Sequence, residues 1–309
     1  MSDGVVRIVS LFAGIGGMDL GALGGFTFLS RHYRKLNTEI ALAVEQERGA
    51  CSVYAENVGD VHCEDVQRIR YWPECDLVIG GPPCQPFSAM GYGDGDNDRR
   101  DMIPAFIEAI AMAQPRAFVM ENVPGLLWRK HIDYFEQSLV ELRALGYRID
   151  HFVLNAADFG VPQIRKRLFV VGLHDGCGKF VRPVPTHGES DEGGLRRWVT
   201  VREALSDLSF AGYDDRLKTL HEGERMTTFS AGARRLVADR PMPTITATAT
   251  AQEKLIHPWF DRYLCVRELK RGMGFPDDFI LPQRCAGLGN AMPPVLAYHV
   301  VKQVLTALK

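Results

Sequence analysis

Cys84 is the residue whose type and surroundings point most directly to chemistry. It lies in DLVIGGPPCQPFS (residues 76–88), just after an apolar run typical of a buried strand. Three prolines around it have a fixed φ and cannot enter a β-ladder, so they hold the thiol on a stiff loop. An inert buried thiol is the alternative, but such cysteines are more often found inside an apolar run. We therefore predict a nucleophile, and Met90, which stands where a phosphatase needs an arginine, excludes that class.

A carboxylate and two guanidinium groups could act beside this thiol. Glu121 ends the apolar run AFVME, so it should lose hydration and its pKa should rise, which would let it share a proton near neutrality. The segment QIRKR (163–167) places Arg165 and Arg167 on one side of a strand by two-residue alternation. Together they could bind an anionic or carbonyl-bearing substrate. A loop-bracing acid and a solvated basic edge are the alternatives.

The segment SLFAGIGG (10–17) reads as a strand that runs into a glycine-rich turn. Glycines permit positive φ and close approach of a ligand, and the free N–H groups of the turn can face an anionic group. Glu45 ends the next apolar run, Asp65 precedes the one after it, and acids at this edge of an α/β sheet commonly hold ribose hydroxyls. The spacing predicts a nucleoside cofactor, whereas the missing third glycine argues against NAD. A tight structural corner is the alternative for the turn taken alone.

A sheet with crossover helices must position these groups. Apolar runs alternate with helix-length amphipathic segments, which is typical of an α/β fold with a parallel sheet. The pattern predicts strands at 5–12, 39–44, 76–81, 117–121, 151–155 and 167–172, and helices at 102–113, 132–145 and 293–308.

Length and charge indicate a second, smaller unit. A chain of 309 residues is longer than a single hydrophobic core usually supports. The glycine, proline and charged residues of 175–194 also interrupt the alternation of predicted strands and helices. Residues 1–159 hold 14 basic and 22 acidic side chains, whereas residues 160–272 hold 19 and 14. The basic excess favours a polyanionic partner for the second part, with a solvated face as the alternative.

Several classes are excluded. The seven cysteines include no C-x-x-C pair, and Arg99 and Ala105 stand where a calcium loop following Asp94 needs glycine and glutamate, so we expect no metal site. No apolar run of membrane-spanning length and no signal peptide is found, so we expect a soluble, cytoplasmic protein with no membrane partner.

In order, the motifs LFAGIGGMDLG, GGPPCQPFS, ENV, QIRKR, PTITA and GLGNAMPP closely resemble the DNA cytosine-5 methyltransferases over nearly the whole chain. The resemblance implies a Rossmann-like class I methyltransferase sheet with helices on both faces, S-adenosyl-L-methionine as cofactor and double-stranded DNA as substrate. It implies that Cys84 attacks C6 of a flipped-out cytosine while Glu121 binds N3 and the amino group. Arg167 would contact the base O2, and Arg165 would hold Cys84 or a phosphate. The stretch 88–101 resembles the loop that closes over the base.

The resemblance also implies a cofactor site. Glu45 would bind the ribose hydroxyls and Asp65 the adenine amino group, while Gln46 stands where an apolar residue often stacks on adenine. The other residues that the resemblance assigns to this site are Phe12, Ala13, Gly14, Ile15, Gly16, Pro82 and, returning from the C-terminus, Asn290.

We expect residues 1–175, completed by 266–309, to form the catalytic domain, and 176–265 to form a small target-recognition domain. The recognition region is shorter than in the family, which leaves open relaxed specificity, a partner protein that supplies recognition, or a non-DNA substrate. The same chemistry on RNA and a catalytically silent nucleic-acid-binding protein are the alternatives. We expect a monomer, and the stretch 29–39, longer than usual in the family, has no predicted role.

Overall fold

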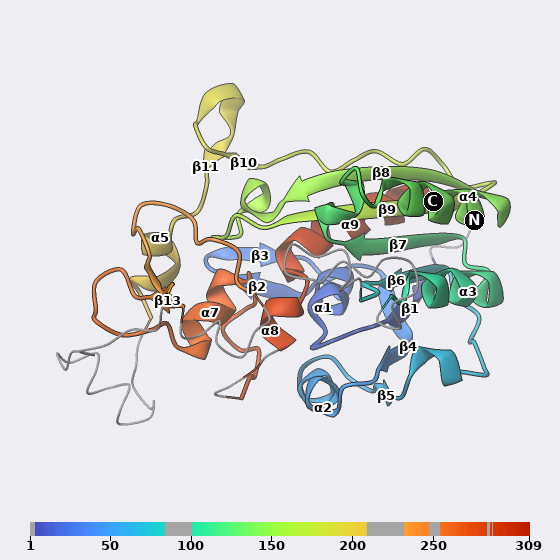
Figure 1. Cartoon of the computed structure of the whole chain (residues 1–309), viewed down its shortest axis with the longest axis horizontal. Coiled ribbons are helices and arrows are strands. Elements are labelled where there is room, and N and C mark those ends of the chain that lie inside the picture. The colour runs from blue at the N-terminus through green and yellow to red at the C-terminus, as the bar shows by residue number, and fades with distance from the viewer. Residues whose placement is uncertain (1–3, 84–100, 209–231, 247–253, 283–284, 286) are drawn as a thin grey trace.

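The computed structural model describes residues 4–83, 101–208, 232–246, 254–282, 285 and 287–309 (Figure 1). Within them, the main sheet has seven strands in the order β5-β4-β1-β6-β7-β9-β8. Their bounds are Val6–Leu11 (β1), Thr38–Glu45 (β4), His62–Cys63 (β5), Leu77–Gly80 (β6), Ala117–Asn122 (β7), Tyr147–Asn155 (β8) and Lys166–His174 (β9). The six predicted strands are thus confirmed, and the two-residue β5 was missed because it is too short to carry a periodicity.

The expectation of a parallel sheet is wrong at one edge. Strands β1, β4, β5, β6 and β7 pair in parallel, but β9 pairs antiparallel with both β7 and β8. Only the short 3-10 helix Ala156–Phe159 and a few further residues join β8 to β9. A connection this short cannot carry the chain back across the sheet, so β9 must run opposite to β8.

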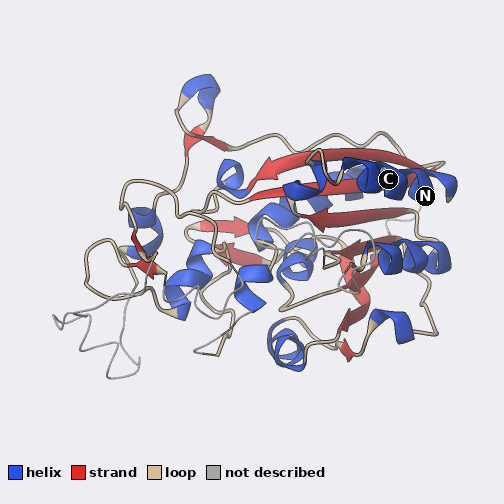
Figure 2. Ribbon diagram, in the orientation of Figure 1, coloured by secondary structure: helices blue, strands red, loops and turns tan. Residues whose placement is uncertain are grey.

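Helices cover both faces of the sheet, as the family resemblance implies (Figure 2). One face packs on α1 (Gly17–Leu23) and α9 (Pro294–Ala307), the other on α3 (Ile103–Ala113) and α4 (Ile132–Ala144). Alternate residues of β6 divide between the two cores, with Leu77 and Ile79 on the α9 side and Val78 on the α3 side. The helix α2 (Arg48–Asn57) follows β4.

The C-terminal helix docks on the first helix, which confirms the expected return of the chain. At Gly21 a Cβ atom would lie 2.5 Å from the Cβ of Ala297, so only glycine lets α1 and α9 approach this closely. The stretch 26–33 forms a hairpin of β2 (Phe26–Phe28) and β3 (Arg31–Tyr33). Tyr33 stacks on Phe26 and meets Tyr298 of α9 edge-on at 5.1 Å, so part of the long 29–39 stretch covers this helix.

The small region gathers at the end of the molecule toward which β7 and β8 point (Figure 1). It contains β10 (His187–Gly188), β11 (Arg196–Arg197), α5 (Val201–Leu205), β12 (Arg234–Arg235) and β13 (Leu255–Ile256). The helices α7 (Val266–Gly272) and α8 (Gly287–Asn290) of the following segment pack against it. Its apolar cluster joins Val201 of α5 with Leu269 of α7 and with Ile15 of the glycine turn. The cluster therefore spans both sides of position 265, where the domain boundary stays a prediction. No helix in the described residues is long and apolar enough to cross a membrane.

A buried carboxyl group lies beneath the glycine turn. Asp19 in α1 is fully buried and accepts a hydrogen bond from the Tyr54 hydroxyl at 2.8 Å. The Tyr54 ring packs against Ala13 and lies under Gly16, where a Cβ would come within 3.0 Å of it. Burial raises the pKa of Asp19 to about 6, and the Ser10 and Tyr54 hydroxyls offset this only in part.

We predict that Asp19→Asn stabilises the fold at pH 8 by about 2–3 kcal/mol. Since the pKa of Asp19 is higher in the folded than in the unfolded chain, wild-type stability falls as the pH rises from about 4 to about 6. The neutral amide keeps the acceptor for Tyr54 without the charge. Thermal unfolding of both proteins between pH 4 and pH 8 measures this. A stability difference independent of pH would contradict it.

Candidate active site

The edge of the sheet where β7 ends carries a buried ion pair. Arg167 Nε donates to Glu121 Oε1 at 2.8 Å, and both side chains are almost buried. The antiparallel register of β7 and β9 brings them together, since Glu121 pairs with Phe169, two residues beyond Arg167. Burial raises the pKa of Glu121, which agrees with the sequence expectation, and the charges of Arg167 and then Arg165 partly offset the rise.

The loop that leads to Cys84 passes this carboxylate. At Gly81 a Cβ atom would lie 3.0 Å from Glu121 Oε2. The Asn122 amide donates to Pro82 O at 3.2 Å, which fastens the loop to the end of β7. Cys84 itself lies outside the described residues, as does most of the predicted closing loop 88–101.

The glycine turn meets Glu45, as the sequence predicts. Gly14 N donates to Glu45 Oε2 and Glu47 N to Oε1, both at 2.8 Å. Phe12 has a φ of 54°, a left-handed backbone conformation that residues other than glycine rarely adopt. A Cβ at Gly14 would meet nothing within 4 Å, so the outer side of the turn is open. Strained backbone beside an open turn is typical of a ligand site.

The remaining predicted cofactor residues surround this turn to different degrees. Ile15 is buried, and a Cβ at Gly287 would lie 3.0 Å from it, so α8 and its exposed Asn290 lie against the turn. Asp65 follows β5, the neighbour of β4, and accepts a hydrogen bond from Gln67 N at 3.0 Å. Pro82 is buried and its carbonyl accepts a hydrogen bond from Asn122, and its place in the cofactor site stays a prediction.

Arg165 makes a different set of contacts from Arg167. It precedes β9, is fully buried, and donates to the backbone carbonyls of Ile245, Gly289 and Ala291 at 2.8 to 3.1 Å. Burial lowers its pKa well below the usual value. Its predicted contact with Cys84 or a phosphate stays a prediction. Asn122 and Gln163 were missed as site residues, although the motifs ENV and QIRKR contain them, because amides carry no charge that marks them in a sequence.

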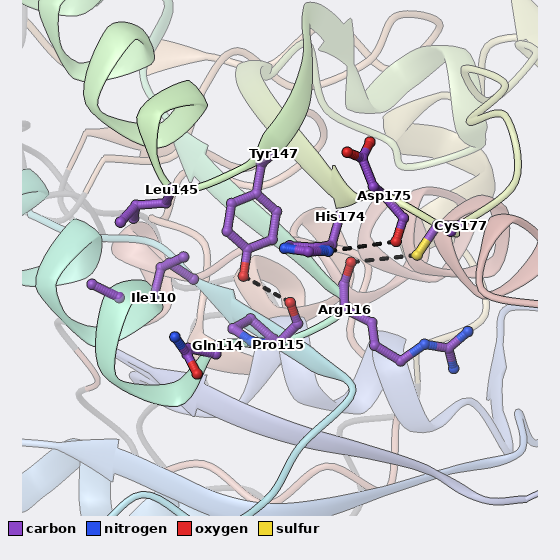
Figure 3. A pocket seen from close by; sticks show the side chains of 11 residues that line it. Ile110, Gln114, Pro115, Arg116, Leu145, Tyr147, His174, Asp175 and Cys177 are labelled. Carbon is purple, nitrogen blue, oxygen red and sulfur yellow. Dashed lines mark hydrogen bonds between the residues drawn. The ribbon is translucent and has the colours of Figure 1, made fainter.

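A cavity of about 460 Å³ opens at the other end of these strands, where β7 and β8 begin (Figure 3). Arg116, which precedes β7, lines it together with Tyr147 at the start of β8 and His174 at the end of β9. The Tyr147 hydroxyl donates to Pro115 O across its wall. None of the predicted site residues lines it, so the cavity is separate from the Glu121 edge.

We predict that Arg167→Met lowers the free energy of unfolding at pH 8 by about 3–5 kcal/mol, because it leaves a buried carboxylate without its cation. The loss should shrink as the pH falls. Without Arg167 the pKa of Glu121 rises further, so the folded state takes up a proton at a higher pH than the unfolded chain does. Urea unfolding between pH 5 and pH 8 measures the loss, with Glu121→Gln/Arg167→Met as the control that removes both charges. A loss of the same size at every pH would count against the pair.

Comparisons with known proteins identify the family of the chain. Residues 6–209 match the family model of the C-5 cytosine-specific DNA methylases. The Type II methyltransferase M.NgoFVII of Neisseria gonorrhoeae is 30% identical over 97% of this chain and 86% of its own. The Type II methyltransferase M.AplI of Arthrospira platensis is 33% identical over 98% of this chain and 86% of its own. The crystal structure of a DNA modification methyltransferase encoded within an E. coli prophage superposes with a TM-score of 0.72 at 22% identity, covering 98% of this chain and 99% of the other. The chain therefore belongs to the C-5 cytosine-specific DNA methylase family, which confirms both the resemblance and the enzyme class expected from its sequence.

Proposed function

We propose that this enzyme transfers a methyl group from S-adenosyl-L-methionine to C5 of a flipped-out cytosine in double-stranded DNA. The observation that carries the proposal is the nearly buried Glu121–Arg167 pair at the edge where the loop to Cys84 begins. A carboxyl with a raised pKa beside a guanidinium suits a base that offers a ring nitrogen, an amino group and a carbonyl oxygen.

The residues around the glycine turn fit the cofactor. The open face above Gly14 can admit the ligand, and the Glu45 carboxylate there can accept bonds from ribose hydroxyls. Asn290 and Asp65 would complete the site from the neighbouring segments. S-adenosyl-L-methionine supplies a methyl group made electrophilic by the positive charge on its sulfur.

The protein's own groups then divide the work on the base. The Cys84 thiolate adds to C6, and the electron pair of the C5–C6 double bond moves to C5, which becomes able to take the methyl group. Glu121 binds N3 and the amino group while Arg167 binds O2, so both stabilise negative charge that spreads into the ring. A water molecule removes the C5 proton, the C5–C6 double bond forms again, and Cys84 leaves as thiolate.

The base must leave the duplex for this chemistry, because C6 is out of reach inside a base stack. Exposed arginines of the small region, Arg196, Arg197, Arg234 and Arg235, supply charge for phosphate contacts. Since the relatives named above are Type II methyltransferases, we propose a cytoplasmic, monomeric enzyme of a restriction-modification system. We also propose a partner protein that supplies target recognition, and RNA is the competing substrate that the experiment below tests against DNA.

We predict that the protein transfers labelled methyl groups from S-adenosyl-L-methionine to duplex DNA, and that Cys84→Ser abolishes the transfer because a hydroxyl is a far weaker nucleophile at neutral pH. Equal amounts of duplex DNA and folded RNA are offered in parallel reactions. The methylated cytosine is then located by base-resolution sequencing of the DNA. Duplexes with 5-fluorocytosine at that position should trap a covalent complex with the wild type only, since no proton can leave C5. Transfer to RNA alone, or full activity of Cys84→Ser, would refute the proposal.

A further inference from the structure

Two buried side chains hold the backbone of one residue of the small region, Ile245, against the catalytic sheet. Ile245 N donates to Gln163 Oε1 at 3.0 Å, and Ile245 O accepts from Arg165 Nη1 at 2.9 Å. Both Gln163 and Arg165 are completely buried. Both the backbone N–H and the backbone C=O of Ile245 are thus hydrogen-bonded to a segment about 80 residues away in the chain.

The backbone reinforces this contact. Ile164 N donates to Met242 O at 2.9 Å, and Met242 N donates to Pro162 O at 2.8 Å. The Thr244 hydroxyl donates to Ile164 O at 2.8 Å. Residues 162–165 and 242–245 therefore form one continuous seam, which we call the 163/245 seam.

The same two side chains reach two further segments. Arg165 Nη2 donates to Gly289 O at 2.8 Å and Ala291 O at 3.1 Å, the carbonyls on either side of Asn290. Gln163 Nε2 donates to Gly272 O at 2.9 Å, at the end of α7. The guanidinium also acts on Glu121, whose pKa its positive charge lowers.

A buried arginine that binds only carbonyl groups contributes little to the stability of a fold. Carbonyl oxygens are weaker partners for a buried guanidinium than a carboxylate is, and apolar side chains often replace buried charges without loss of stability. Arg165 instead connects the segment that enters the small region, the segment that carries Asn290 and the electrostatic surroundings of Glu121.

We propose that Gln163 and Arg165 are positioning residues that couple the small recognition region to the cofactor segment through the backbone N–H and C=O of Ile245. The proposal rests on the function proposed above. Gln163 sets where residues 242–245 lie on the sheet, and Arg165 relates that position to the segment that carries Asn290.

The two residues should therefore have separable effects. We predict that Gln163→Leu weakens duplex DNA binding and raises the KM for DNA by ~10-fold, while the Kd for S-adenosylhomocysteine changes less than ~3-fold. Arg165→Lys keeps the charge but cannot reach three carbonyls, so it should also weaken S-adenosylhomocysteine binding by ~10-fold and lower kcat by ~10- to 100-fold. Calorimetry gives the two Kd values and steady-state kinetics gives KM and kcat.

Asn57→Ala is the matched control. Asn57 binds both backbone groups of Ile280 in the same way, accepting from its N–H at 2.6 Å and donating to its carbonyl at 2.9 Å, and it is not a partner of Arg165. It should leave the DNA and S-adenosylhomocysteine constants within ~2-fold of wild type. Thr244→Val removes one bond from the exposed side of the 163/245 seam and should raise the KM for DNA by ~3-fold even if Gln163→Leu does not fold.

The proposal would be overturned if folded Gln163→Leu and Thr244→Val kept the wild-type KM and Kd for DNA. It would also be overturned if their losses of DNA affinity were no larger than that of Asn57→Ala. The proposed function fails separately, when the wild type methylates neither DNA nor RNA. If it methylates RNA alone, the same constants are measured with RNA. If it methylates neither, the Kd values for duplex and S-adenosylhomocysteine still decide the coupling.

Discussion

The antiparallel return of β9 beside β7 is the constraint on which the active site depends. A parallel strand in this place would bring its carboxyl end to the site edge, and its first residues would lie at the far edge of the sheet. Because β9 runs the other way, its second residue, Arg167, meets Glu121 near the end of β7. The cation is therefore supplied by the beginning of a strand, whereas the acid is supplied by the end of one. The reversal thus gives Glu121 a cation at this edge of the sheet.

Desolvation gives this pair its chemical character. Burial raises the pKa of Glu121, and the guanidinium of Arg167 at 2.8 Å lowers it. The two opposing effects leave a carboxyl group whose pKa stays above its usual value although a cation lies beside it. Asn122 acts at the same strand end as Glu121, because its amide donates to Pro82 O. The end of β7 thus fixes both the acid and the backbone at Pro82.

Sequence reasoning succeeded where local pattern determines structure. Strands and helices with strong periodicity, the junction of the glycine turn with Glu45 and the docking of the C-terminal helix all follow from short motifs or from burial patterns. It failed for the direction of β9, because direction depends on the length of a connection and not on the strand itself. The partners of Arg165 were also out of reach, since carbonyls at 245, 289 and 291 belong to segments that have no marked side chain there. Backbone acceptors look the same in every residue of a sequence.

The shared apolar cluster limits how far the recognition region can shrink. Its members include Leu236, Leu255 and Leu264 of the small region, and they pack with Ile15 of the glycine turn and Ala50 of α2. Removing that packing would expose one side of the glycine turn, so the small region supports this turn. A shorter small region must therefore lose sequence between these anchoring residues while the anchors stay. The packing of the small region is thus continuous with that of the glycine turn and of α2.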